Sequence, residues 1–185
     1  MIRTFIAVKI PSVIQQVISD FQKSVSEEIP GIRWIKPENI HITLKFIGEI
    51  KEELVDRIIR DVMNVPQGEK KFDLSISGTG VFPNLKRPRI FWIGINRGSK
   101  KLSKLASCIE DRLIPMGIQK EKRSFKPHIT IGRFKNIPHI SGLSEFVSPE
   151  VFGECEFPVS EFHLMKSTLM PTGAEYESLA GCALQ

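Results

Sequence analysis

The sequence predicts an α+β fold in which one strand-helix-strand-helix-strand unit occurs twice, giving two pseudo-symmetric lobes whose antiparallel sheets face a central cleft. The first reason is a repeated motif: residues 39–45 read Asn-Ile-His-Ile-Thr-Leu-Lys and residues 127–133 read Pro-His-Ile-Thr-Ile-Gly-Arg. The second is the matching order of blocks, since a strand-like apolar run and then a helical pattern precede the motif in both halves. We therefore expect a single domain, 1–185, of two lobes, about 1–82 and 83–185.

The first half is expected to hold four strands and two helices. Strands are predicted at residues 4–10 and 32–35, and between them a helix opens at Pro11 and breaks at 29–31, with apolar residues at helical spacing. The motif strand follows at 40–47, before an amphipathic helix at 51–63. Residues 72–77 alternate as a strand does, and the Gly-Thr-Gly of 78–80 is expected to bend the chain.

The second half is expected to repeat this order. Residues 90–95 are apolar almost throughout, which indicates a buried strand. A helix whose inward positions run from Leu102 to Leu113 follows, and residues 114–117 break it. The remaining predicted elements are a second motif strand at 127–134, a short helix at 140–146, and strands near 151–157, 162–167 and 176–183.

Alternation along the two motif strands places a His and a Thr on one face of each. Successive side chains of a strand point to opposite faces, so His41 and Thr43 share a face, as do His128 and Thr130. A lone His-x-Thr is more often ordinary polar alternation than a site. Because two of the four His of the chain fall in matching contexts, we expect each half to bring one imidazole to a shared site.

Charge and cysteine content limit the class of protein. The net charge is +5, and basic residues gather at 86–89, 100–104 and 120–126, which favours a polyanionic partner such as nucleic acid over a purely solvated surface. Three distant Cys form no C-x-x-C, and the N-terminus has no apolar run long enough for a signal peptide or membrane span. We expect a soluble, cytoplasmic protein with no membrane association and no obligate protein partner.

Two histidines can carry out acid–base chemistry without a metal. The motif His lack the Cys or carboxylate neighbours of a zinc site, and no phosphate-binding Gly loop is present, so we expect neither metal nor cofactor. One imidazole can remove a proton while the other donates one, which suits phosphoryl transfer. Thr43 and Thr130 could bind phosphate oxygens, and Arg133 could add a cation if the strand bends near Gly132; otherwise Arg133 is a solvated strand-end residue.

These residues resemble the two-histidine (2H) phosphoesterase superfamily, and specifically the RNA 2′,3′-cyclic phosphodiesterases, also called 2′-5′ RNA ligases. The resemblance covers nearly the whole chain. It lies in the blocks RTFIA at 3–7, WIKPENIHITLKFIGE at 34–49, FPNLKRPRIFW at 82–92 and FKPHITIGR at 125–133.

The resemblance implies a metal-independent enzyme that opens a terminal 2′,3′-cyclic phosphate of RNA to a 2′-phosphomonoester. It implies that His41 and His128 are catalytic, with His41 protonating the leaving O3′ and His128 activating water, or the reverse. It also implies that Thr43, Thr130 and Arg133 bind the phosphate. Phe46 would stack on the terminal base, although strand alternation alone makes Phe46 a core residue. Reversal of the reaction would be a minor 2′-5′ ligation without ATP.

Two other functions remain open on the sequence. The first is a non-catalytic RNA or nucleotide-binding module, and the second is an esterase for small cyclic nucleotides or an ADP-ribose cyclic phosphate. Among RNA ends, tRNA fragments are one candidate substrate. His139 and His163 are interpreted as structural, the two Trp as core or cleft wall, and Tyr176 has no predicted role.

Overall fold

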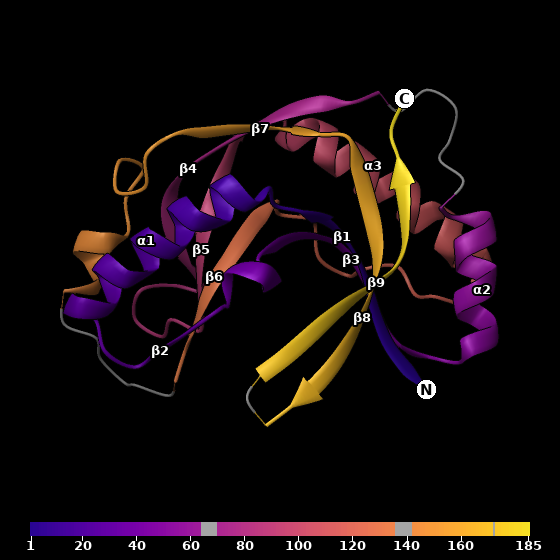
Figure 1. The fold of residues 1–185 in the computed structure, drawn as a ribbon, viewed down its shortest axis with the longest axis horizontal. Helices are drawn as coiled ribbons and strands as arrows, with labels where there is room; N and C mark the ends of the chain where they lie inside the picture. Colours follow the sequence, from indigo (N-terminus) through magenta and orange to yellow (C-terminus); the bar gives the residue numbers. More distant parts are fainter. Residues whose placement is uncertain (64–69, 136–141, 172) are drawn as a thin grey trace.

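The computed structural model describes residues 1–63, 70–135, 142–171 and 173–185 (Figure 1). The first half contains β1 (Ile2–Lys9), α1 (Ser12–Glu28), β2 (Ile32–Trp34), η1 (Pro37–Asn39), β3 (His41–Ile50), α2 (Glu52–Asp61) and β4 (Phe72–Phe82). The second half contains β5 (Ile90–Arg97), α3 (Ser99–Leu113), η2 (Ile114–Met116), β6 (His128–Phe134), η3 (Leu143–Phe146), β7 (Cys155–Val159), β8 (Glu161–Met170) and β9 (Gly173–Ala183). None of the described helices is long and apolar enough to cross a membrane.

Two antiparallel sheets confirm the predicted α+β class, and each sheet takes strands from both halves of the chain. The first sheet has the order β3-β1-β8-β9, and the second has the order β2-β6-β5-β4-β7. Strand β4 therefore joins the sheet of the second motif, whereas β8 and β9 join the sheet of the first motif. The lobe boundary near residue 82 stays a prediction.

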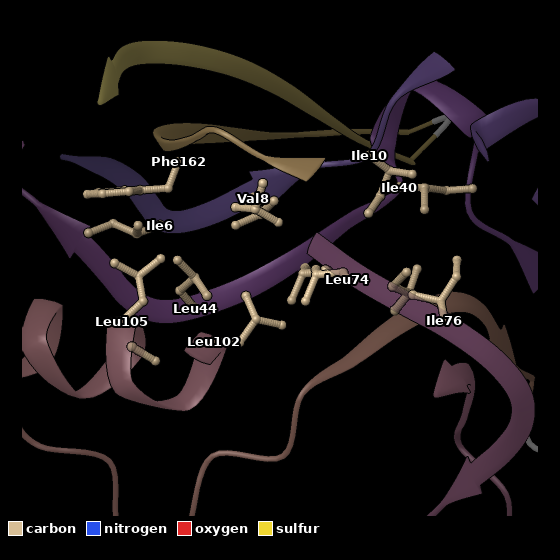
Figure 2. Packing of buried hydrophobic residues seen from close by; sticks show 14 of the residues in the cluster. Ile6, Val8, Ile10, Ile40, Leu44, Leu74, Ile76, Leu102, Leu105 and Phe162 are labelled. Carbon is tan, nitrogen blue, oxygen red and sulfur yellow. The ribbon is translucent and has the colours of Figure 1, made fainter. Parts of the chain in front are cut away.

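The helices also cross between the halves. Helix α1 packs on the second sheet, where the Phe21 ring lies 6.4 Å from that of Phe91 on β5. Helix α3 packs beneath the first sheet, and Figure 2 shows its Leu102 and Leu105 facing Ile6, Val8 and Leu44 of β1 and β3. One continuous apolar core results, and this core ties the two motif strands to each other.

Three predicted details differ from the structure in extent or type. Residues 78–80 do not end the strand, because β4 continues to Phe82 and absorbs Gly78, at a φ of 62°, as an irregularity between Ser77 and Thr79. The helix predicted at 140–146 is a 3₁₀ turn at Leu143–Phe146, and its first two residues lie outside the described part of the chain. The second half also has no described strand equivalent to β2 between α3 and β6.

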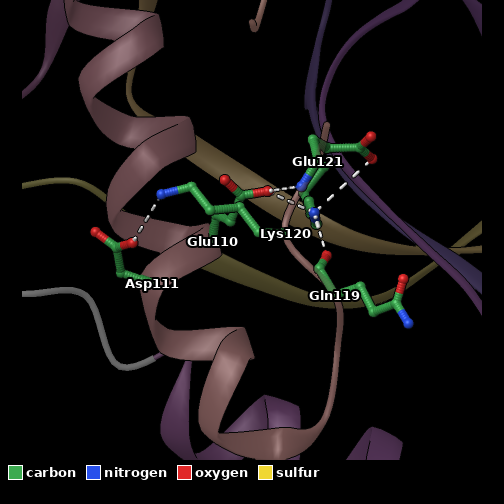
Figure 3. A network of polar contacts seen from close by, with 6 residues as sticks. Glu110, Asp111, Gln119, Lys120 and Glu121 are labelled. Carbon is green, nitrogen blue, oxygen red and sulfur yellow. Dashed lines mark hydrogen bonds and ion pairs between the residues drawn. The ribbon is translucent and has the colours of Figure 1, made fainter. Parts of the chain in front are cut away.

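A buried lysine connects the first motif strand to the segment that leads into the second. The Lys45 side chain on β3 is only 2% exposed, and its Nζ lies 2.6 Å from the Glu110 carboxylate of α3. Nζ also donates to the Gln119 carbonyl at 2.8 Å, and the same Glu110 oxygen accepts the Glu121 N–H at 2.7 Å (Figure 3). The Lys45 ion pair lowers the pKa of Glu110 against the opposing effect of burial.

Replacing Lys45 by Met is expected to lower the free energy of unfolding by about 3 kcal/mol, because it leaves the Glu110 carboxylate without its cation. Urea unfolding measures the change. The double variant Lys45→Met/Glu110→Leu should recover most of the loss.

Lys23→Met is the matched control, because Lys23 forms an exposed ion pair with Asp20. Its loss should stay below about 1 kcal/mol. Equal losses in Lys45→Met and Lys23→Met would contradict a stabilising role for the buried pair.

Candidate active site

Each motif histidine is the first residue of its strand, and each makes the same backbone hydrogen bond. Nδ1 of His41 lies 2.7 Å from the Asn39 carbonyl, and Nδ1 of His128 lies 2.7 Å from the Lys126 carbonyl. A carbonyl oxygen only accepts, so Nδ1 carries the hydrogen in both rings. Nε2 is then the basic nitrogen of both neutral imidazoles, and this is the nitrogen left for chemistry.

The motif threonines lie beside the imidazoles as the alternation predicts. The Thr43 hydroxyl donates to Nε2 of His41 at 3.0 Å, and Thr130 lines the same cleft as His128. A hydroxyl in this position can also turn toward a bound oxygen, because its hydrogen rotates freely.

A β-bulge after each motif histidine brings a further side chain of that strand to the cleft. In β3, Ala7 pairs with Thr43 and Ile6 pairs with Lys45, so Leu44 is a β-bulge. In β6, Trp92 pairs with Thr130 and Phe91 pairs with Gly132, so Ile131 is a β-bulge. Both bulges lie three residues after the motif histidine.

Each bulge reverses the alternation, so the residue five positions after the histidine returns to the histidine face. Phe46 is 60% exposed and lines the cleft, which shows that its alternative assignment to the core was wrong. Arg133 also lines the cleft. The bend near Gly132 that would bring Arg133 to the histidine face is this bulge.

All six predicted site residues line one cleft of about 1200 Å³ between the two sheets. They are His41, Thr43, Phe46, His128, Thr130 and Arg133. The structure thus brings together groups that lie 87 positions apart in the sequence. Arg3, Arg89, Arg123 and Lys126 add positive charge to the same walls.

Aromatic rings that the sequence did not assign to the site hold each imidazole edge to face. The Tyr176 ring lies 5.2 Å from that of His41, and the Phe82 ring lies 5.1 Å from that of His128. Such pairs restrict the rotation of a ring. Tyr176 had no predicted role, because its strand β9 joins the His41 sheet only through β8. Trp92 stacks beside Phe82 and lies over Gly80, where a Cβ would come 2.1 Å from the indole.

His163, the other histidine of the described residues, does not line this cleft. His163 is buried, with Nδ1 3.0 Å from the Ser178 hydroxyl and Nε2 3.1 Å from the Glu161 carboxylate, as expected of a structural residue. His139 lies outside the described residues. Within the described ranges, no group of three His, Cys, Asp or Glu side chains is placed to hold a metal ion.

Comparison with known proteins gives the same duplication. The family model described as LigT like Phosphoesterase matches the chain twice, at residues 8–92 and 93–176. The chain belongs to the LigT-like phosphoesterase family.

Similar proteins match over nearly their whole length. The chain is 36% identical to the RNA 2′,3′-cyclic phosphodiesterase of Archaeoglobus fulgidus over 178 residues, 96% of this chain and 97% of that protein. A crystal structure from Thermus thermophilus has a TM-score of 0.83 at 28% identity, covering 98% and 97% of the two chains. E. coli LigT complexed with 3′-AMP has a TM-score of 0.81 at 25% identity, covering 100% and 98%.

The electrostatics of this LigT-like cleft keep both motif imidazoles neutral near pH 7. Burial lowers the pKa of His41 and His128 below 6.5, because the charged ring loses hydration. The hydrogen bonds to the Asn39 and Lys126 carbonyls oppose this effect, whereas the positive charge of Arg133 lowers both pKa values further. The charge of Arg133 therefore adds to the larger effect of burial on both histidines.

Replacing Arg133 by Gln is expected to raise the pKa of His41 and His128 together, because it removes the charge that disfavours both imidazolium forms. NMR titration of the imidazole resonances measures the shift. In the unmodified protein both pKa values should lie below 6.5.

His163 serves as the internal control, because burial and Lys9 lower its pKa without a contribution from Arg133. Arg133→Lys, which keeps the charge, should leave all three pKa values nearly unchanged. A shift of only one motif histidine in Arg133→Gln would contradict a shared cation.

Proposed function

We propose that this protein hydrolyses terminal 2′,3′-cyclic phosphates of RNA to 2′-phosphomonoesters, with His41 and His128 as a general acid and a general base. The observation that carries the proposal is the pair of motif imidazoles with the same Nδ1 anchor in one cleft. The names of the relatives, including the RNA 2′,3′-cyclic phosphodiesterase of A. fulgidus, support the substrate class.

In the proposed reaction, water attacks phosphorus and the P–O3′ bond breaks. Nε2 of His128 accepts the proton of the attacking water, and Nε2–H of protonated His41 gives its proton to O3′. The net change is the addition of one water, after which solvent returns the two rings to their starting forms. The pseudo-symmetry of the anchors also permits the opposite assignment of the two histidines.

The remaining site residues would bind the phosphate and the base. Arg133 can pair with a non-bridging oxygen, and the hydroxyls of Thr43 and Thr130 can donate to the oxygens as negative charge builds up. Exposed Phe46 offers a flat ring on which the terminal base can stack. These groups supply acid, base, cation and hydrogen-bond donors, so the proposal includes no metal or cofactor.

Run in reverse, the same steps would join a cyclic phosphate to a 5′-hydroxyl as a 2′-5′ bond without ATP. We regard ligation as a minor activity, because water is always present in excess. Fragments of tRNA are one proposed source of substrate ends. A cytoplasmic location belongs to the same proposal and accords with the absence of a disulfide among Cys108, Cys155 and Cys182.

Replacing either His41 or His128 by Ala is expected to lower kcat by about 10²–10⁴-fold, because each change removes one proton transfer. Conversion of a cyclic-phosphate oligonucleotide to the 2′-phosphate product, assayed with a chelator present, measures the loss. His163→Gln, outside the cleft, should keep normal turnover.

The same assay separates the alternative functions. Full activity in both single His variants would contradict acid–base catalysis by this pair. Tight binding without turnover by the unmodified protein would indicate a binding module instead. Turnover of small cyclic nucleotides alone would indicate the small-molecule esterase.

The dependence of kcat/KM on pH is expected to be bell-shaped with its maximum below pH 6.5. The active form needs one neutral and one protonated imidazole, and the free protein lowers the pKa of both rings below that value. Raising the pH from 6 to 8 should therefore decrease kcat/KM. A maximum above pH 7 would be inconsistent with this pair acting as acid and base.

Replacing Phe46 by Ala is expected to raise KM for the cyclic-phosphate oligonucleotide by an amount equivalent to about 1–3 kcal/mol of lost stacking. Phe46→Trp should retain binding. Steady-state kinetics on ribose 2′,3′-cyclic phosphate, which has no base, should show no effect of either change.

Leu169→Ala is the control for loss of an exposed apolar side chain, because Leu169 is 69% exposed and does not line the cleft. Equal effects of Phe46→Ala and Leu169→Ala would rule out base stacking on Phe46.

A further inference from the structure

The chain between η2 and β6 forms a wall that is shared by two cavities. It contains no helix or strand, and Lys45 and Glu110 fix its start through Gln119 and Glu121. Its residues line the catalytic cleft and also a second, neighbouring cavity of about 290 Å³. Residues common to both cavities are Leu44, Lys45, Glu121, Arg123, Ser124 and Phe125.

The second cavity is lined by groups suited to phosphate. Helix α3 contributes the hydroxyl residues Ser103 and Ser107, and the wall contributes Lys120, Lys122 and Ser124. Ammonium groups bind phosphate by charge, and hydroxyl groups can donate hydrogen bonds to its oxygens. Lys120 and Lys122 do not line the catalytic cleft.

The carboxylates beside this cavity are already paired. Glu110 lies 2.6 Å from Nζ of Lys45, and Glu121 lies 3.8 Å from the same nitrogen. Lys120 makes only a long, exposed contact with Asp111, at 3.9 Å. Lys122 and Arg123 are exposed and have no carboxylate partner among the described residues. The local field at the wall is therefore positive.

Phe46 lies next to residues that the two cavities share, because it follows Leu44 and Lys45 on β3. An RNA strand whose terminal base stacks on Phe46 can therefore continue along the wall toward the second cavity. The cleft alone exceeds the roughly 300–1,000 Å³ typical of sites for a single drug-sized ligand, which leaves room for more than one nucleotide.

We propose that the second cavity and its wall bind the backbone phosphates of the RNA strand just 5′ of the terminal nucleotide. The inference rests on the proposed function and extends it, because it makes an RNA oligonucleotide a better substrate than a cyclic mononucleotide. Lys120, Lys122 and Arg123 supply the charge, and Ser107 and Ser124 supply neutral donors. Anchoring by Lys45 holds the wall in place before the RNA arrives.

The test compares adenosine 2′,3′-cyclic phosphate with RNA oligonucleotides of increasing length that end in a 2′,3′-cyclic phosphate. In the unmodified protein, kcat/KM should rise as nucleotides are added. In Lys120→Gln/Lys122→Gln this gain should fall several-fold, whereas kcat/KM for the mononucleotide stays unchanged. The slope of log kcat/KM against log salt should become shallower by about 0.7 for each phosphate of the single strand that the variant no longer binds.

Lys100→Gln/Lys101→Gln is the matched control. It removes the same charge from exposed positions on α3 that line neither cavity. It should keep the gain with length. An equal loss in both double variants would overturn the local site in favour of a general electrostatic effect.

The outcomes also separate this inference from the proposed function. If the unmodified protein hydrolyses the mononucleotide but gains nothing from added nucleotides, the phosphate site fails and the proposed function stands. If it hydrolyses neither substrate, the proposed function is contradicted, and the phosphate site that rests on it is contradicted as well. Loss of mononucleotide activity in Lys120→Gln/Lys122→Gln would overturn the site 5′ of the terminal nucleotide.

Discussion

A β-bulge three residues after each motif histidine decides which side chains reach the cleft. Without the bulges at Leu44 and Ile131, strict alternation would turn Phe46 and Arg133 toward the core side of their sheets. Helix α1 stabilises the second bulge. The buried side-chain amide of Gln22 donates hydrogen bonds to the carbonyls of Ile131 and Ile35, at 2.8 and 2.9 Å. A helix from the first half thus fixes the backbone that orients the arginine of the second half.

The two motif strands have equivalent backbones, but different residues at matching positions make the two sides of the cleft chemically different. The histidine, its carbonyl anchor, the threonine and the bulge recur at matching positions in both strands. Four residues after the histidine, however, the first strand has buried Lys45 and the second has Gly132; five residues after it stand Phe46 and Arg133. A nucleotide between two equivalent imidazoles would therefore meet an aromatic ring on one side and a cation on the other.

The sequence predicted what depends on local pattern and missed what depends on long-range pairing. Period-two alternation was sufficient for the shared face of His41 and Thr43, and helical spacing was sufficient for α1 and α3. The joining of β8 and β9 to the first sheet leaves no local signal, so Tyr176 beside His41 could not be predicted. The bulge at Leu44 was equally hidden, because an inserted residue is defined by its partner strand. The buried position of Lys45 could not be predicted either, because its partner carboxylate, Glu110, is brought to it only by the packing of α3.

The charge on Arg133 connects anion binding to proton uptake. In the free cleft, this guanidinium is one of the reasons that His41 and His128 have lowered pKa values. A phosphate monoanion that pairs with Arg133 reduces the net local charge from positive to neutral, and so removes the repulsion that each imidazolium would experience. By linkage between the proton and the anion, this loss of repulsion raises the pKa of both rings. Since the proposed reaction needs one protonated imidazole, the substrate itself would bring about the protonation that its hydrolysis requires.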